Sequence, residues 1–411
     1  MWPVRLILVA SVFIVVNTSI RCFGTEPEPF CGHELEDPTR QQVPPIGHYV
    51  AKLIFISFAG VCDGDDPCVQ DLPPHYINDL PNSLSAFLAA ESRGQLTIAC
   101  STLTDPNHPN RYWVAANPLS YYQQLEDAGS DGWKAVNGEI LETIRGVYGQ
   151  VIDCDLLFFF HRYKIATDWA GNSGTGLSLP IDDVTTAHAG ITVNIRTSRS
   201  PAANIFSYAT LKFIVQHELG HVLYLGHTAA DSTMSYGVYA VMRPSVIHET
   251  GFVPFNPVDL TRLGWVAAPQ PIVAETLALS LHDLQGDSPN YLCVDLQAFG
   301  AAFANEHLRL SYHSGIGSAY GVYPSTGVSI WHVQDNWWDL EQANGRYGNP
   351  DLEINPDPVD GLDRMDRRSS YPLGDEHFAK YYRGHETDFF QVAMGGITEF
   401  SYRTNPSTFG S

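Results

Sequence analysis

The stretch HELGHVLYLGH, from His217 to His227, decides how the rest of this sequence is interpreted. Successive helical residues turn by about 100°, so His217 and His221 lie about 40° apart on one face and their two imidazoles can bind one ion. On an unbroken helix His227 would point about 80° away and lie roughly 15 Å along the axis. His227 can join the pair only if the helix breaks first, and we predict the break at Gly226.

These residue types predict a catalytic zinc site. Three neutral histidine nitrogens leave the fourth tetrahedral position open for water, which is the catalytic pattern. Glu218 follows the first histidine directly and can act as general base and acid when that water attacks a peptide carbonyl. The alternative, histidines that bind no metal, needs the spacing to arise by chance, which happens in about one in a thousand such chains. Activity is expected to fall with chelators and at acid pH.

Length and charge bound the rest of the chain. A chain of 411 residues is expected to form two domains. Its formal charge of -22 opposes approach to nucleic acid and to anionic membrane surfaces. We therefore expect protein or peptide substrates as partners and no nucleic acid, and the oligomeric state stays open.

Residues 1–24 have the pattern of a secretory signal peptide. A basic start ends at Arg5, and the apolar run Leu6–Val16 that follows is too short for a comfortable membrane span. Cleavage between Asn17 and Gly24 would leave a secreted, extracellular chain with no stable membrane anchor. The alternative is an uncleaved anchor.

Cysteine content predicts disulfide bonds in such a secreted chain. Cys22 lies in the signal segment, which leaves an even number of cysteines and up to three disulfides, with the connectivity open. The remaining cysteines are Cys31, Cys62, Cys68, Cys100, Cys154 and Cys293.

The N-terminal half alternates predicted strands and helices, which is typical of a layered α+β or α/β unit. Buried strands are predicted at 49–58, 95–99 and 155–160, and helices at 83–92 and 133–145. A third helix is predicted from about Ser207 through the histidine motif. It carries a buried stripe of Leu211, Ile214, Val215, Leu219 and Val222.

Two regions complete the secondary-structure pattern. Ile191–Thr197 alternates better than the other strands, so we predict that it lies at a sheet edge with one face in water. After Trp265 a linker over Ala267–Glu275 leads into short strand-like segments separated by Gly, Pro, Asn and Asp, which is typical of a β-sandwich.

The histidine motif resembles that of the metzincin metallopeptidases, HExxHxxGxxH followed by a turn that contains a methionine. The resemblance implies that His217, His221 and His227 bind one catalytic Zn²⁺ ion. It also implies that Met234 supports their imidazoles without binding the metal. Tyr236 matches the position where some metzincins place a tyrosine that ligates zinc or stabilises the oxyanion. The alternative role for Tyr236 is packing within the turn.

One position departs from the family pattern. The eighth motif residue is Tyr224 where the family has glycine, and a bulky residue at positive φ is strained. We therefore expect either that the helix continues and ends at Gly226 or that the site is distorted.

Further stretches extend the resemblance loosely over most of the chain. They are similar to secreted peptidases of the immune inhibitor A type and partly to gametolysin: SLSAFLAAESRGQLTIA (83–99), RLGW (262–265) and TGVSIWHVQDN (326–336). In metzincins the sheet edge above the cleft binds substrate in an extended, antiparallel manner. This makes the predicted edge strand the substrate-binding element and 237–243 the far wall of the specificity pocket. The substrate-binding residues would be Ile191, Thr192, Val193 and Asn194.

The implied fold class is α+β. A metzincin-like catalytic domain over 44–268, with a mixed twisted sheet and three main helices, follows the signal (1–24) and an N-terminal segment (25–43). A β-sandwich-like C-terminal domain occupies 269–411.

Two weaker signals have alternatives. Cys31 faintly resembles the propeptide cysteine that keeps some metzincins latent, but a disulfide is preferred because the switch would leave five cysteines. The acidic stretch Asn349–Asp366 has the oxygen ligands that Ca²⁺ prefers. Its spacing fits no named calcium loop, so a solvated acidic loop is favoured.

Together these observations predict a secreted zinc endopeptidase. The alternatives are a secreted zinc-containing binding protein that no longer cleaves, and, below it, a zinc hydrolase that acts on a non-peptide amide. Turnover separates these alternatives, whereas metal content does not.

Overall fold

The computed structural model describes residues 43–60, 71–149, 154–165, 171–173, 189–200, 203–225, 251–267, 270–271, 281, 291–295, 306–313, 327–334 and 337–340. The chain divides into two compact units, which we describe separately. The N-terminal unit consists of Glu34–Gly226 and Glu249–Phe252, and the C-terminal unit of Met1–His33, His227–His248 and Val253–Ser411.

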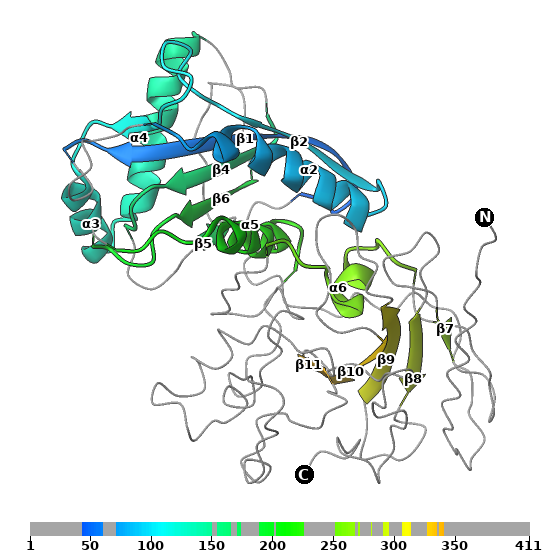
Figure 1. Cartoon of the computed structure of the whole chain (residues 1–411). Helices are drawn as coiled ribbons and strands as arrows, with labels where there is room; N and C mark the ends of the chain where they lie inside the picture. Colours follow the sequence, from blue (N-terminus) through cyan, green and yellow to red (C-terminus); the bar gives the residue numbers. More distant parts are fainter. Residues whose placement is uncertain are drawn as a thin grey trace, which may run out of the picture. The chain divides into compact units, whose positions relative to one another are not determined.

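A mixed, mainly parallel sheet forms the framework of the N-terminal unit (Figure 1). Its strand order is β2-β1-β4-β6-β5, and β3 pairs with the far end of β1. All neighbours are parallel except β5, which runs antiparallel to β6. The strands are β1 (Gly47–Phe58), β2 (Leu96–Thr102), β3 (Trp113–Ala115), β4 (Leu156–His161), β5 (Gly171–Ser173) and β6 (Ala189–Asn194). The predicted mixed sheet is confirmed, and β3 and β5 are too short for the sequence pattern to have revealed them.

The three main helices that the sequence predicts are present in the N-terminal unit, together with two shorter ones. They are α1 (Pro74–Ile77), α2 (Asp79–Glu91), α3 (Leu119–Asp127), α4 (Gly132–Tyr148) and α5 (Tyr208–Val222). α2 begins at Asp79, earlier than predicted. Pro81 is tolerated in its first turn, because the N–H that proline lacks would have no acceptor within the helix there. The predicted stop at Gly94 is confirmed, since this residue has a φ of 75° and its N–H binds the Ala89 carbonyl.

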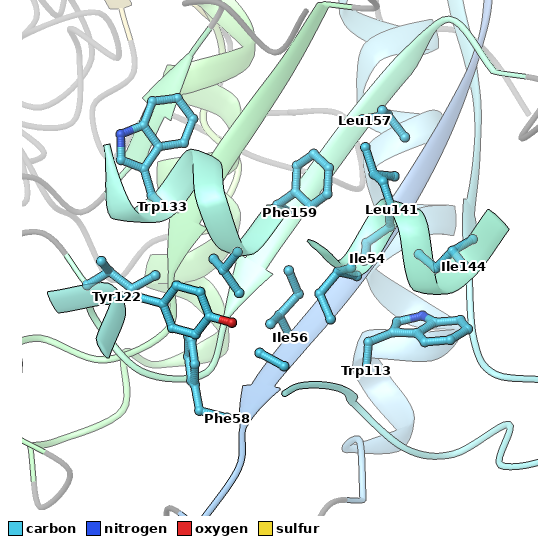
Figure 2. Close-up of a cluster of buried hydrophobic side chains, with 14 of the residues drawn as sticks. Ile54, Ile56, Phe58, Trp113, Tyr122, Trp133, Leu141, Ile144, Leu157 and Phe159 are labelled. Carbon is cyan, nitrogen blue, oxygen red and sulfur yellow. The ribbon is translucent and has the colours of Figure 1, made fainter. Parts of the chain in front are cut away.

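Successive side chains of β1 point to opposite faces of this sheet. Ile54, Ile56 and Phe58 are fully buried in a cluster with residues of α3, α4 and β4, which Figure 2 shows from the side of α4. On the other face the Phe55 ring stacks on Phe160 with centroids 4.5 Å apart. The near-continuous apolar runs of β1 and β4 therefore reflect a sheet that is covered on both sides.

Ile191–Thr197 is not the sheet edge that its alternation predicted. β6 pairs with β4 on one side and β5 on the other, and all its residues are buried. Thr192 is polar but accepts a hydrogen bond from Asn137 Nδ2 (3.0 Å), and Asn137 Oδ1 accepts one from His161 Nε2 (2.7 Å). The polar positions therefore mark a buried hydrogen-bond network and not a face in water.

Two serine hydroxyls close the free edge of β2. The Ser92 Oγ accepts a hydrogen bond from the Leu96 N–H (2.9 Å), and the Ser85 Oγ accepts one from the Cys100 N–H (3.2 Å). Both serines come from α2 or its C-terminal cap. These two N–H groups are unavailable to another strand, which makes this edge a poorer template for pairing.

The C-terminal unit contains a five-stranded sheet in the order β11-β10-β9-β8-β7. Its strands are β7 (Gln270–Pro271), β8 (Tyr291–Asp295), β9 (Glu306–His313), β10 (Gly327–Gln334) and β11 (Trp337–Leu340). Leu292, Leu308 and Ile330 belong to an apolar cluster on one face. Trp331, the next residue along β10 after Ile330, is 1% exposed, so the opposite face of β10 is covered as well. The second sheet of the predicted sandwich stays a prediction, because most of 269–411 lies outside the described residues.

Helix α6 (Pro257–Arg262) contacts β9 of the same unit. Asn256 caps it by accepting hydrogen bonds from the Val258 and Asp259 N–H groups. Asp259 is fully buried, and burial raises its pKa to about 7 against the opposing effect of nearby Arg262 and Arg309. Residues 253–267, which include α6, group with the C-terminal unit. The sequence suggested a domain boundary after residue 268, and that boundary stays a prediction.

The predicted disulfides and the predicted signal segment involve residues of which the structure describes only some. Cys100, Cys154 and Cys293 form no disulfide with one another, and Cys100 is a free thiol, so at most two of the three suggested disulfides can form. Cys31, Cys62 and Cys68 lie outside the described residues, as do the signal segment and the acidic stretch 349–366. Within the described part of the chain, no helix is long and apolar enough to span a membrane.

We expect Gly132→Ala to destabilise the N-terminal unit. A Cβ atom at Gly132, the first residue of α4, would lie 2.0 Å from the Tyr122 carbonyl oxygen of α3. The free energy of unfolding should fall by about 1–3 kcal/mol because α3 must move. Gly146→Ala lies in the same helix with no atom within 4 Å of its Cβ and should raise it by about 0.5–1 kcal/mol. Urea denaturation measures both, and equal effects would contradict this close approach.

Candidate metal centre

Helix α5 carries the first two predicted zinc ligands. It begins as predicted at Ser207, whose Oγ accepts a hydrogen bond from the Thr210 N–H (3.1 Å). The predicted stripe is buried, and α5 contacts both β5 and β6. Because most of the helix surface is covered, its polar motif residues are held within the fold.

His217 and His221 lie side by side, one turn apart on α5. Their ring centroids are 4.9 Å apart and the ring planes are nearly perpendicular, at 88°. His217 is half-buried, and Glu218 and His221 are buried. The two imidazoles are thus adjacent, as the spacing predicted, and the Glu218 side chain that follows the first of them in the sequence is buried.

The end of α5 is sharper than the sequence suggested. The helix ends at Val222, and Tyr224 has a φ of 71°. The Leu225 N–H binds the Gly220 carbonyl (2.9 Å) and the Tyr224 N–H binds the His221 carbonyl (3.2 Å). This pair of bonds is a Schellman motif, in which the left-handed position normally holds glycine.

Tyr224 therefore occupies the position of the family's glycine. The expectation that the helix continues to Gly226 is wrong, because the chain already reverses at Tyr224. The left-handed conformation costs a non-glycine residue about 1–2 kcal/mol. The Tyr224 residue is 39% exposed, so packing does little to offset this cost.

The reversal after α5 orients one of the predicted ligands. It brings the Leu225 carbonyl oxygen within 2.8 Å of His221 Nδ1, which must donate because a carbonyl can only accept. His221 Nε2 then carries the lone pair that a metal ion needs. No pattern of side chains could have revealed Leu225, since it acts through its backbone.

The remaining predicted site residues lie outside the described part of the chain. These are His227, Met234, Tyr236 and the pocket wall 237–243. Among the described residues no three metal-binding side chains converge. The site is therefore described for two of its three predicted ligands and for Glu218.

The substrate-binding role predicted for Ile191, Thr192, Val193 and Asn194 loses its structural basis. Both edges of β6 are paired, so its backbone cannot bind an extended peptide. The antiparallel edge strand is β5, which pairs only with β6 among the described residues and contacts α5. Its three residues, Gly171–Ser173, contain neither a β-branched nor an aromatic side chain, which is why composition did not mark them as a strand.

The described residues fit a zinc ion. The two imidazoles are adjacent, one has its tautomer set by a backbone carbonyl, and the Glu218 side chain is buried. Histidine nitrogens are typical ligands of catalytic zinc. The chain break that the third ligand needs comes at Tyr224, three residues before His227.

Comparisons with known proteins add little. No family model matches the chain, and no curated protein matches it. Among solved structures, archaemetzincin from Methanopyrus kandleri is similar over 52% of this chain and 93% of its own length, with 14% sequence identity and a TM-score of 0.22. Similarity at this level does not identify the family of this chain.

Tyr224→Gly should stabilise the N-terminal unit. Glycine removes the strain at positive φ but loses more conformational entropy on folding, so we expect a net gain of about 1 kcal/mol in the free energy of unfolding. Tyr224→Ala removes the same ring but keeps a Cβ atom at φ 71° and should give no such gain. Thermal or urea denaturation compares them, and equal stability of the two variants would argue against the left-handed turn.

Proposed function

We propose that this chain is a secreted zinc-dependent endopeptidase of metzincin type. The observation that carries the proposal is the end of α5, where His217 and His221 lie side by side, Glu218 is buried and the helix ends at Val222, before His227. A helix that ends before His227 meets the condition that the sequence sets for the third histidine to join the first two. In this proposal His217, His221 and His227 hold the ion.

Glu218 acts as general base and acid in the proposed reaction. Zinc, when bound, acts as a Lewis acid that makes water acidic near neutral pH. Glu218 takes the proton as the water attacks the peptide carbonyl, and it later delivers this proton to the leaving amine. Its burial keeps bulk water from competing for the same proton.

The proposed substrate is an extended peptide that pairs with β5. The two edges of the sheet differ, because serine hydroxyls occupy N–H groups of β2, whereas β5 is paired on one side only among the described residues. β5 also contacts the helix that carries the histidines. A peptide added antiparallel to β5 would therefore lie beside the proposed zinc ligands.

Loss of the carboxylate tests the reaction. The purified chain should cleave an unfolded protein, and Glu218→Gln should lower the rate by about 10²–10⁴-fold while keeping bound zinc. Glu142→Gln, which removes an exposed carboxylate paired with Arg145, should leave the rate unchanged. Zinc content and cleavage are measured on all three proteins. A chain that binds zinc but cleaves nothing would favour the alternative, a secreted zinc-containing binding protein.

Backbone methylation of a peptide substrate tests the role of β5. In an antiparallel pair only every second residue directs its N–H at the neighbouring strand. N-methylation at one set of alternate residues should therefore slow cleavage about five- to tenfold per lost hydrogen bond. Methylation at the other set should have little effect. If both sets slow cleavage equally, or neither does, the peptide does not pair with a strand in this way.

A further inference from the structure

The first described residues of the N-terminal unit lie at the carboxyl end of α5. Residues Val43–Gly47, which we call the strap, lead directly into β1. The Val43 N–H donates a hydrogen bond to the Val222 carbonyl (3.0 Å), which belongs to the last residue of α5. The segment that precedes β1 thus contacts the end of the helix that carries two of the proposed zinc ligands.

Several bonds hold the strap in place. The Tyr49 hydroxyl donates to the Pro44 carbonyl (3.0 Å), and the Gly47 N–H binds the Gln95 carbonyl (2.9 Å). Pro44 and Pro45 restrict the backbone to extended conformations, and Val43 is restricted too because it precedes a proline. The strap is therefore stiff, and the prolines make Val43 the last N–H donor before Ile46.

The contact with Val43 completes the hydrogen bonding of the α5 terminus. The last carbonyl groups of a helix have no N–H donor within the helix. The Leu219 and Gly220 carbonyls accept from Leu223 and Leu225, and the His221 carbonyl accepts from Tyr224. The Val222 carbonyl accepts from the strap instead. The strap thus fixes the turn from outside, at the residue that follows His221.

We propose that the strap is a positioning element of the zinc site and that Val43 acts through its backbone N–H. The inference rests on the proposed function. Fixing Val222 holds the turn that places the Leu225 carbonyl against His221 Nδ1. Groups that orient a metal-binding histidine typically change metal affinity by 10–100-fold. It follows that proteolytic trimming of the N-terminal segment must stop before Val43 to leave full zinc affinity.

The test compares Val43→Pro with Val43→Ala in the full chain. Proline removes the N–H donor, whereas alanine keeps it and removes only the side chain. The zinc dissociation constant is measured by competition with a chelator, and the absorption spectrum of the Co²⁺-substituted protein reports on the ligand geometry. We expect roughly tenfold weaker zinc binding and an altered Co²⁺ spectrum for Val43→Pro, with neither change for Val43→Ala.

A purely structural role would give a different result. In that case Val43→Pro would lower the melting temperature of the zinc-free chain but leave the Co²⁺ spectrum of the folded protein unchanged. This result would overturn the inference. Equal zinc affinity for Val43→Pro and Val43→Ala overturns it as well. If Val43→Pro does not fold, Tyr49→Phe decides, because it removes only the hydroxyl that holds Pro44. It should weaken zinc binding in the same direction, and unchanged affinity would refute the role of the strap.

The same measurements separate this inference from the proposed function. If the wild-type protein binds zinc but shows no cleavage that depends on Glu218, the proposed peptidase activity is refuted. The role of the strap is still decided by the Val43 variants, because their readout is zinc affinity. Wild-type protein that cleaves, with Val43→Pro unchanged, refutes the strap alone. Wild-type protein that binds no zinc refutes both.

Discussion

The reversal of the chain at the end of α5 is the constraint on which the candidate site depends. Two backbone hydrogen bonds, from Leu225 to Gly220 and from Tyr224 to His221, turn the chain back within two residues. Only this turn brings the Leu225 carbonyl to His221 Nδ1 and selects the imidazole nitrogen that remains for a metal. The turn requires one residue in the left-handed conformation, and here that residue is Tyr224, which is strained at positive φ.

The sheet of the N-terminal unit sets what lies next to this turn. The central parallel strands β1 and β4 are covered on both faces, which leaves the two edges of the sheet for binding another strand. Hydroxyl groups of Ser85 and Ser92 close one edge. The other edge is a short antiparallel strand that contacts α5. Edge chemistry and helix placement thus favour the same side of the unit for an extended ligand.

Both units bury polar side chains within their sheets. Asn137 links Thr192 to His161 in the N-terminal unit. In the C-terminal unit the Ser311 and Ser329 hydroxyls lie 2.7 Å apart on opposing residues of β9 and β10. Each of these side chains has a hydrogen-bond partner from another element, although His161 Nδ1 has none among the described residues, and such partners make the burial of a polar group tolerable. Alternation of polar and apolar residues therefore does not indicate a solvent face in this protein.

The sequence by itself determined the features that depend on local spacing. The pairing of His217 with His221, the start of α5 at Ser207 and the buried strands β1 and β4 follow from helical periodicity, side-chain capping and continuous apolar runs. Tertiary structure alone decided the place of β6 inside the sheet, the closure of β2 and the contact of Val43 with Val222. These depend on which backbone groups meet across long sequence separations, and a backbone hydrogen bond leaves no trace in the identity of the side chains that flank it.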